Sequence, residues 1–343
     1  MKSAEPNPGA LKIGVVGAGS WGTTLANLLV KKHDNVTLWA FEPDLVERMR
    51  KTRENDLFLP GFALDRELAF SNDLVEVVAG KDLLLLVPPS QVMRRVVEQA
   101  AAHIAPGTLI VSAAKGIENE TLQLMSQVLA ETLPAPLGER LAFLSGPSFA
   151  REVAAEMPTA VAVAAADPAI CRAAQEVFST AAFRVYTNDD VIGIELGGAL
   201  KNVIALAAGV SDGLGFGHNT RAALITRGLA EMTRLGLALG AQPATFAGLA
   251  GMGDLVLTCT GDLSRNRSVG MELGRGRTLE EILAGMTMVA EGVKTTLSAY
   301  QLAAKLGVEV PIIAQMYRIL YQGKSPRQAV SELMLRELKP EGL

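Results

Sequence analysis

Cysteine is scarce in this sequence, with only Cys171 and Cys259 among 343 residues. The two thiols stand in different kinds of segment, and their spacing matches neither a paired metal-binding motif nor a disulfide framework. Disulfide-rich extracellular folds and cysteine-based metal sites are therefore excluded, and no metal ion is expected. A reducing cytoplasm is the simplest compartment for such a chain.

A strong charge of one sign and long hydrophobic runs are also missing. The net charge is −4 at pH 7, which removes the general electrostatic attraction that basic proteins have for nucleic acids and anionic lipids. The longest apolar stretches, such as 160–166 and 203–210, are far shorter than the ~20 residues of a membrane-spanning helix. Residues 1–10 are polar and contain no apolar core of signal-peptide length. We therefore expect a soluble protein without nucleic-acid partners or membrane insertion.

What the chain has in quantity is apolar material, since 49% of its residues are hydrophobic and 20% are charged. A chain of this length exceeds one ordinary hydrophobic core, so we expect two domains. From residue 11 to about 189, short apolar runs alternate with longer amphipathic ones, which is typical of a parallel sheet with crossover helices. The expected strands are 11–16, 35–40, 82–87, 108–112, 141–144, 159–164 and 183–186. The expected helices are 23–32, 43–51, 91–103, 121–133 and 168–180.

After about residue 190 the strand-like runs disappear, and alanine, leucine, glutamate and arginine dominate. The expected helices here are 191–210, 220–239, 264–273, 279–283, 293–306, 312–321 and 326–332. The sequence therefore predicts the α/β class. We expect a Rossmann-like domain over residues 1–190 and an all-helical domain over residues 191–343.

A glycine-rich turn of sequence G-A-G-S-W-G, residues 17–22, joins the first expected strand to an amphipathic helix. Gly17 permits the tight turn, Gly19 lets the backbone approach a pyrophosphate, and Gly22 allows the helix to pack closely on the strand. The helix N-terminus presents unpaired N–H groups to the anion. This combination of strand, turn and helix predicts a dinucleotide site.

The choice between NAD and NADP depends on the end of the second expected strand. Glu42 lies about twenty residues after Gly22, where an acidic side chain can accept a hydrogen bond from the ribose 2′-hydroxyl and repel a 2′-phosphate. This interpretation favours NAD. Alternatively, Glu42 simply opens the helix that begins with Pro43 as a solvated acid. The residues alone leave both interpretations open.

Lys201 is the only lysine or arginine between Arg184 and Arg221, and it stands among glycine, alanine and aliphatic residues. An ammonium in such surroundings is partly desolvated, which lowers its pKa and suits it to acid–base catalysis. Gly197 and Ala205, one helical turn before and after it, are expected to leave room for a ligand. The alternative is a lysine that snorkels at a helix surface.

Two further segments follow expected strands. Lys115 comes after the strand 108–112, at the carboxyl end where α/β proteins bind ligands, and a cation there suits an anionic ligand. The segment 146–150, of sequence G-P-S-F-A, lies at the corresponding end of the next strand. It can offer backbone N–H groups and the Ser148 hydroxyl to a ligand. A second role for Ser148, compatible with the first, is capping of the following helix.

The helical half contains a carboxylate and a candidate phosphate site. Asp254 can orient or ionise Lys201. Ser264, Arg265 and Asn266 stand where a helix is expected to begin, and a guanidinium together with N-terminal N–H groups is a strong phosphate-binding arrangement. The same spacing fits a capped helix with solvated arginines, so both interpretations stay open.

Taken together, these segments resemble the NAD(P)-dependent glycerol-3-phosphate dehydrogenases of the bacterial type over nearly the whole chain. The motifs stand in the family's order, which makes the set far more specific than the glycine-rich turn alone. The residues that carry the resemblance are 17–22, 55, 58–60, 89–90, 114–116, 145–150, 197–203, 253–255, 264–267 and 291–292.

The resemblance implies a role for each candidate residue. Lys201 is expected to accept the proton when sn-glycerol 3-phosphate is oxidised and to donate it when dihydroxyacetone phosphate is reduced, with Lys115 and Asp254 as the other catalytic residues. The implied substrate contacts are Lys115, Gly146, Ser148, Lys201, Asp254, Ser264, Arg265 and Asn266, with Arg265 facing the phosphate. The implied cofactor contacts are Gly17, Gly19, Ser20, Trp21, Gly22, Phe41, Lys115, Ala150, Arg265, Val289 and Glu291.

Phe41 departs from the family pattern, because many relatives carry histidine or arginine at this point near the adenosine ribose. This difference counts against a preference for NADP. The resemblance also implies a homodimer and a supply of glycerol 3-phosphate for glycerophospholipid synthesis. Two alternatives are a related 3-hydroxyacid or ketopantoate-type reductase and a non-catalytic NAD(P)-binding regulator. The phosphate candidate at Arg265 argues against the first, and Lys201 with Asp254 argues against the second.

Overall fold

The computed structural model describes residues 11–286, 290–338 and 340–341. Contacts divide the chain into two compact units. The first comprises the described part of Met1–Ala114 together with Ser126–Leu144 and Ser148–Asp189. The second comprises Lys115–Met125, Ser145–Pro147 and the described part of Asp190–Leu343.

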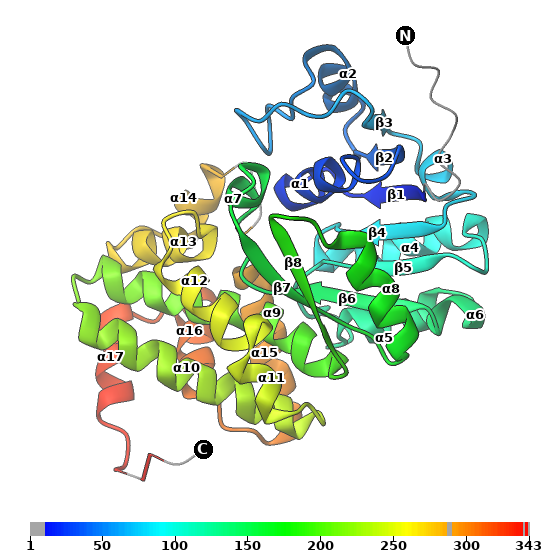
Figure 1. Cartoon of the computed structure of the whole chain (residues 1–343). Helices are drawn as coiled ribbons and strands as arrows, with labels where there is room; N and C mark the ends of the chain where they lie inside the picture. Colours follow the sequence, from blue (N-terminus) through cyan, green and yellow to red (C-terminus); the bar gives the residue numbers. More distant parts are fainter. Residues whose placement is uncertain (1–10, 287–289, 339, 342–343) are drawn as a thin grey trace. The chain divides into compact units, whose positions relative to one another are not determined.

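The first unit is built on one sheet, which has eight strands among the described residues, in the order β3-β2-β1-β4-β5-β6-β7-β8 (Figure 1). The strands are β1 (Lys12–Val16), β2 (Asn35–Trp39), β3 (Ala69–Ser71), β4 (Leu83–Leu86), β5 (Leu109–Ser112), β6 (Leu141–Ser145), β7 (Thr159–Ala164) and β8 (Phe183–Asn188). Strand β1 pairs in parallel with β2 and β4, and the pairs β2–β3, β4–β5, β5–β6 and β7–β8 are parallel as well. The order of the first six strands is that of a doubly wound dinucleotide-binding sheet, which confirms the predicted fold class.

All seven strands expected from the sequence are present, and β3 was missed. The four leucines of β4 are all buried, as expected for a sheet with helices on both faces. Gly14 in β1 has a packing reason, because a Cβ there would lie 2.2 Å from the carbonyl oxygen of Val77. The helices along this part of the chain are α1 (Ser20–Leu29), α2 (Pro43–Thr52), α3 (Leu74–Val78), η1 (Ser90–Val92), α4 (Met93–Ala100), η2 (Ala101–His103), α5 (Met125–Thr132), α6 (Ala135–Gly138), α7 (Ala150–Ala154) and α8 (Pro168–Phe178).

The second unit is helical after residue 190, as the sequence predicted. Helix α9 contacts α10, α12, α13 and α15 (Figure 1), and every residue from Gly193 to Ser211 on it is buried. A helix that is apolar on all sides is typical of the centre of a bundle. The helices are α9 (Val191–Gly213), α10 (His218–Ala238), α11 (Pro243–Ala247), the π-helix η3 (Leu249–Gly253), α12 (Asp254–Thr260), α13 (Arg265–Gly274), α14 (Leu279–Ala284), α15 (Glu291–Leu306), α16 (Pro311–Gln322) and α17 (Pro326–Met334).

By length and composition, α9 is the one helix in the described part of the chain that could cross a membrane. However, 83% of its apolar window is buried inside the structure, as in the core helix of a globular fold. The helix is longer than the apolar stretches evident in the sequence, because the buried residues Glu195 and Lys201 interrupt its apolar run.

The segment after Lys115 differs from its prediction. The helix expected over 121–133 begins only at Met125, because Ile117 and Leu124 form an antiparallel bridge before it. Both side chains lie in the hydrophobic core of the second unit, and the Ser298 hydroxyl donates to the carbonyl of Ile117 over 3.2 Å. The chain next to Lys115 is thereby fixed to the helical unit.

Candidate active site

The glycine-rich turn has the geometry of an anion-binding site. Gly17 adopts φ 113°, and a Cβ on Gly22 would lie 1.9 Å from the carbonyl oxygen of Gly17, so both positions require glycine. A Cβ on Gly19 would instead point into open space. Helix α1 then begins at Ser20 without a side-chain cap and without an acidic residue in its first turn. The N–H groups of that turn are thus suited to a pyrophosphate.

Other cofactor candidates of the first unit lie around α1 and β2. The Trp21 indole packs at a tilt on Phe183, with 6.4 Å between ring centroids, and among the described residues its buried Nε1 has no hydrogen-bond partner. Thr24 donates to the carbonyl of Ala150 over 3.2 Å, which holds the start of α7 against α1. Phe41 follows β2 and is 73% exposed.

Glu42 precedes α2, and its side chain makes no capping hydrogen bond. The carboxylate therefore does not serve as a hydrogen-bonded cap for the helix that begins with Pro43. Its half-buried position after β2 remains compatible with a ribose contact.

The second unit brings Lys201, Lys115 and Asp254 together. The Lys201 ammonium on α9 donates to Oδ1 of Asp254 and, over 3.0 Å, to the hydroxyl of Thr258. Lys115 donates to Oδ2 of Asp254 over 2.6 Å and to the carbonyl of Gly146 over 3.1 Å. Asp254 is 0% exposed and Lys201 only 8%, so the alternative of a snorkelling lysine is wrong.

Burial and neighbouring charges act in opposite directions on Lys201. The pKa of Lys201 is lowered to about 8, chiefly because burial disfavours the ammonium, and the positive charge of Lys115 acts in the same direction. The carboxylate of Asp254 raises the pKa and limits that shift. An amine with such a pKa can both donate and accept a proton near neutral pH, which suits acid–base catalysis.

Two glycines of α9 explain how this cluster is assembled. A Cβ on Gly198 would lie 2.6 Å from the Ser145 hydroxyl and 3.4 Å from Cγ of Lys115. A Cβ on Gly197 would lie 2.4 Å from the carbonyl oxygen of Ala250 in η3. The expectation that Gly197 leaves room for a ligand is therefore wrong, because η3 fills that space. The close approach of η3 in turn places Asp254, the first residue of α12, beside α9.

Thr258 is a member of the cluster that the sequence analysis missed. Its hydroxyl accepts from Lys201 and donates to the backbone carbonyl of Asp254 over 2.6 Å. The signal was its position four residues after Asp254, which on a helix puts the two side chains on one face. That signal requires α12 to be known as a helix, and the sequence pattern predicts no helix there.

The phosphate candidate lies at the start of α13. Ser264 is the N-cap and accepts from the backbone N–H of Arg267 over 3.2 Å. Arg265 follows it and is exposed. Partial burial of its guanidinium lowers the pKa of Arg265, whereas the charge of Glu291 raises it. Arginine remains protonated at neutral pH in either case, so one exposed cation stands in the first turn of this helix.

Asn266 lies next to Arg265 and is largely enclosed. Its Nδ2 donates to Oδ1 of Asn202 over 2.9 Å, and its Oδ1 accepts from the backbone N–H of Gly292 over 3.0 Å. Asn266 therefore connects α13 with α9 and α15. The alternative of solvated arginines is wrong for Arg267, whose guanidinium contacts Asp212 and Asp262.

Three other candidates complete the set. The carbonyl of Gly146 accepts from Lys115 in the second unit. Ser148 is not the N-cap of α7, because that position is taken by Phe149. Val289 lies outside the described residues.

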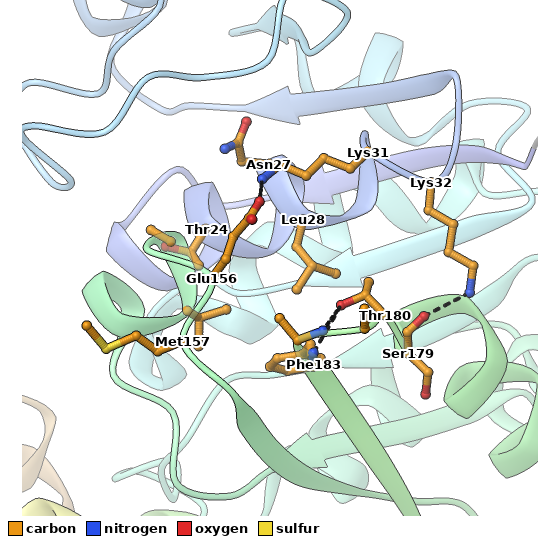
Figure 2. Close-up of a pocket in the computed structure, with 14 residues that line it drawn as sticks. Thr24, Asn27, Leu28, Lys31, Lys32, Glu156, Met157, Ser179, Thr180 and Phe183 are labelled. Carbon is orange, nitrogen blue, oxygen red and sulfur yellow. Dashed lines mark hydrogen bonds and ion pairs between the residues drawn. The ribbon is translucent and has the colours of Figure 1, made fainter.

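A cavity of about 310 Å³ in the first unit contains none of the candidate residues. It lies beside the second half of α1 and includes Lys31, Lys32 and Glu156 (Figure 2). Lys31 forms an ion pair with Glu156, and Lys32 donates to the carbonyl of Ser179 over 3.1 Å. Both lysines therefore interact with groups of the protein itself. We do not assign this cavity a role in the proposed reaction.

Known proteins are similar to this chain over nearly its whole length. The family model described as the N-terminus of NAD-dependent glycerol-3-phosphate dehydrogenase matches residues 12–171, and that of the C-terminus matches residues 190–331. The glycerol-3-phosphate dehydrogenase (NAD(P)+) of Syntrophotalea carbinolica is 68% identical over 331 residues, which cover 96% of this chain and 99% of that protein.

Two further comparisons extend this similarity. The enzyme of the same description from Citrifermentans bemidjiense is 66% identical over 334 residues, which cover 97% of this chain and 100% of that protein. The crystal structure of glycerol-3-phosphate dehydrogenase from Coxiella burnetii superposes with a TM-score of 0.92 at 41% identity, covering 96% of this chain and 100% of that chain.

Proposed function

The chain belongs to the NAD-dependent glycerol-3-phosphate dehydrogenase family, and from this premise we propose that it transfers hydride reversibly between NAD(P)H and dihydroxyacetone phosphate, giving sn-glycerol 3-phosphate. The observation that carries the proposal is the buried Lys201 ammonium, which shares the carboxylate of Asp254 with Lys115. The nicotinamide supplies the hydride when bound. The protein must then supply a proton, a positive environment and a hold on the phosphate.

Lys201 is the proton donor for the reduction. As hydride adds to the carbonyl carbon, the oxygen gains negative charge and takes a proton from the ammonium. In the reverse direction the neutral amine accepts the proton of the alcohol. Its pKa of about 8 leaves both protonation states accessible at neutral pH.

Lys115 and Asp254 hold Lys201 in its working position. Two ammonium groups share a single carboxylate, so the cluster carries one net positive charge when both lysines are protonated. That charge favours an anionic substrate and stabilises negative charge on the reacting oxygen. Lys115 also donates to the carbonyl of Gly146, which connects this proposed substrate-binding residue to the acid–base pair.

The first turn of α13 is proposed to bind the substrate phosphate. Arg265 offers an exposed guanidinium there, and the helix N-terminus adds its N–H groups. Ser264 and Asn266 shape the turn through the hydrogen bonds described above. A site of this kind distinguishes phosphorylated from unphosphorylated ketones, and thus argues against a 3-hydroxyacid or ketopantoate-type reductase.

For the cofactor, we assign residues 1–190 as the NAD(P)-binding domain and 191–343 as the substrate-binding and catalytic domain. The pyrophosphate region would be bound by Gly17, Gly19, Ser20, Trp21 and Gly22. The adenosine ribose would lie near Phe41 and Glu42. Further contacts are proposed for Lys115, Ala150, Arg265 and Glu291. Glu42 favours NAD over NADP because its charge repels a 2′-phosphate.

The test is a spectrophotometric assay of the purified protein with dihydroxyacetone phosphate and either NADH or NADPH. We expect oxidation of the reduced nicotinamide, faster with NADH at equal concentrations. Absence of turnover with both cofactors would overturn the enzymatic proposal. That result would favour a non-catalytic NAD(P)-binding regulator instead. Equal kcat/KM for dihydroxyacetone and its phosphate would contradict the phosphate site.

At the level of the cell, we propose a cytoplasmic homodimer that supplies glycerol 3-phosphate for glycerophospholipid synthesis. The scarcity of cysteine agrees with a reducing compartment. Light scattering of the purified protein tests the dimer, and a monomeric mass at micromolar concentration contradicts it. Depletion of the protein in a cell without another source of glycerol 3-phosphate is expected to stop phospholipid synthesis and to be rescued by added glycerol 3-phosphate.

A further inference from the structure

Helices α9 and α13 are in direct backbone contact at four glycines. A Cβ on Gly209 would lie 2.0 Å from the carbonyl oxygen of Arg267, and one on Gly270 would lie 2.0 Å from that of Leu206. At the next turn, a Cβ on Gly213 would lie 2.1 Å from the carbonyl oxygen of Met271, and one on Gly274 would lie 2.4 Å from that of Val210. Each helix therefore contributes two glycines spaced four residues apart, which lets the backbones approach as closely as two helices can.

These contacts define a single register between the two helices. Asn202 is hydrogen-bonded to Asn266 across a sequence separation of 64, and the same separation relates Leu206 to Gly270 and Val210 to Gly274. The helices thus run in the same direction, with one turn of α13 beside one turn of α9. A slip by one turn would move α13 by about 5.4 Å along its neighbour.

The register matters because each helix carries a proposed functional group, Lys201 on α9 and Arg265 on α13. Asn202 directly follows Lys201 on α9, and Asn266 directly follows Arg265 on α13. The axial offset between the helices consequently fixes how far the proposed phosphate-binding turn lies from the proton donor. A rigid spacing of this kind is what a substrate with its phosphate at a fixed distance from its carbonyl requires.

A buried ion pair holds the register at the end of α9 remote from Lys201. Asp212 accepts from Nε of Arg267 over 2.8 Å, and its other oxygen accepts from Nε of Arg221 on α10 over 3.0 Å. The side chains of Asp212 and Arg267 are 7% and 12% exposed. Arg267 also donates to Asp262 over 3.1 Å, in the loop before α13. One guanidinium therefore connects the first turn of α13 and its preceding loop to α9.

We propose that Asp212 and Arg267 are positioning residues that set the reach between proton donor and phosphate, and so the enzyme's preference for a phosphorylated ketone. The inference rests on the proposed function and adds no ligand contact of its own. Its consequence is specific: loss of the Asp212–Arg267 pair lets the first turn of α13 shift relative to Lys201. Use of dihydroxyacetone phosphate is then impaired, whereas reduction of unphosphorylated dihydroxyacetone, which makes no phosphate contact, is not.

The test compares kcat/KM for dihydroxyacetone phosphate and for dihydroxyacetone in two variants, Asp212→Asn and Arg267→Lys. The second keeps the charge but removes the guanidinium that contacts both Asp212 and Asp262. We expect the preference for the phosphorylated ketone to fall by roughly tenfold in each variant, as for loss of one charge-assisted contact. The loss is expected mainly in KM, with kcat and the affinity for NADH within about twofold of the wild type. The double variant is expected to be no worse than the more affected single variant.

Arg221→Gln is the matched control, because it removes the other partner of the same carboxylate but leaves Arg267 in place. Its preference between the two ketones is expected to stay unchanged. Equal losses for both ketones in Asp212→Asn and Arg267→Lys, or the same change of preference in Arg221→Gln, would show a general loss of stability and overturn the inference. An unchanged preference in all three variants would overturn it too. Failure of the proposed function is distinguishable, since wild-type protein would then reduce neither ketone.

Discussion

Lys115 and Lys201 bind opposite oxygens of one fully buried carboxylate, that of Asp254. That anion offsets part of the cost of burying the two ammonium groups, because an unpaired buried ammonium is strongly disfavoured. One carboxylate does not neutralise two cations, however. The positive charge of Lys115 adds to the effect of burial and lowers the pKa of Lys201. The cluster thus lowers the pKa of Lys201 towards neutrality, which suits this lysine to proton transfer.

Replacement of Lys201 by alanine tests its role in proton transfer. We expect Lys201→Ala to lower kcat by roughly 10²–10⁴-fold, the usual contribution of a positioned acid–base group. NADH affinity is expected to stay near the wild-type value, because the proposed pyrophosphate site is formed by the glycine-rich turn. Steady-state kinetics and NADH fluorescence titration measure the two quantities. Lys294→Ala, a change at an exposed position of α15, serves as the control, and a Lys201→Ala enzyme with near-normal kcat would remove Lys201 from the mechanism.

The pH dependence of the two reaction directions follows from the lowered pKa of Lys201, about 8. Reduction needs the ammonium, so kcat for reduction is expected to fall as pH rises through about 8. Oxidation needs the neutral amine, so kcat in that direction is expected to rise over the same range. In Asp254→Asn the stabilising anion is absent, so the pKa of Lys201 falls further and both transitions move to lower pH. Profiles that coincide in wild type and variant would contradict the coupling of Lys201 to Asp254.

Stability responds to the same group with a defined sign. The folded-state pKa of Lys201 lies below the unfolded value of 10.5, so between about pH 8 and 10.5 the unfolded chain binds more protons than the folded one. The contribution of Lys201 to the free energy of unfolding therefore rises with pH in that window. Below about pH 8 the buried charge costs stability in full, which indicates that this lysine is retained for function.

The fold could be predicted largely because its signals are local. Seven strands of the sheet are apolar runs bounded by turns, and the glycine-rich turn stands between two of them. Strand β3 was missed because its three residues are too few for a periodic pattern. The π-helix Leu249–Gly253 and the short α12 after it were missed for another reason. Their conformation depends on packing against α9, and no local pattern in 249–260 indicates that packing.

The site was predictable in its residues more than in its geometry. Lys201 could be singled out because it is an isolated cation in an apolar helix. Lys115 stood out because it follows a strand, and Asp254 as a carboxylate able to ionise Lys201; the family motifs supported both. Thr258 and the Asp212–Arg267 pair were not predicted, since both depend on which helix faces pack together. The expectation that Gly197 leaves room for a ligand was wrong. Its missing side chain admits a neighbouring backbone, and sequence alone does not distinguish that from room for a ligand.

Arg265 is expected to act on substrate affinity. Arg265→Ala removes the exposed cation from the first turn of α13, and we expect KM for dihydroxyacetone phosphate to rise by the equivalent of about 1.5–3 kcal/mol, as for a hydrogen bond to a charged group. Turnover of dihydroxyacetone is expected to change little. Arg275→Ala, which removes an exposed arginine from the end of the same helix, is the control. An unchanged KM for the phosphorylated ketone would exclude Arg265 from the phosphate site.

Glu231 on α10 predicts a pH-dependent stability that is separate from catalysis. Its two carboxylate oxygens accept from the backbone N–H groups of Ile312 and Ile313 over 2.6 and 3.1 Å, at the start of α16. These hydrogen bonds favour the anion, but burial outweighs them and raises the pKa of Glu231 to about 7. Because this folded-state value lies above the unfolded one, the contribution of Glu231 is complete below about pH 4.5 and is lost as pH rises to about 7.

Between about pH 4.5 and 7 the unfolded chain ionises at Glu231 while the folded protein keeps this group protonated, so Glu231 is expected to lower the stability of the wild type as pH rises through that window. In Glu231→Gln that part of the slope is expected to disappear. The variant is also expected to be destabilised by about 1–3 kcal/mol, because the amide group cannot accept from both N–H groups at once. Urea unfolding at a series of pH values measures both effects, with Glu280→Gln as a control at an exposed position. If wild type and Glu231→Gln have the same slope, another group causes the pH dependence, and the carboxylate that caps α16 stays ionised throughout.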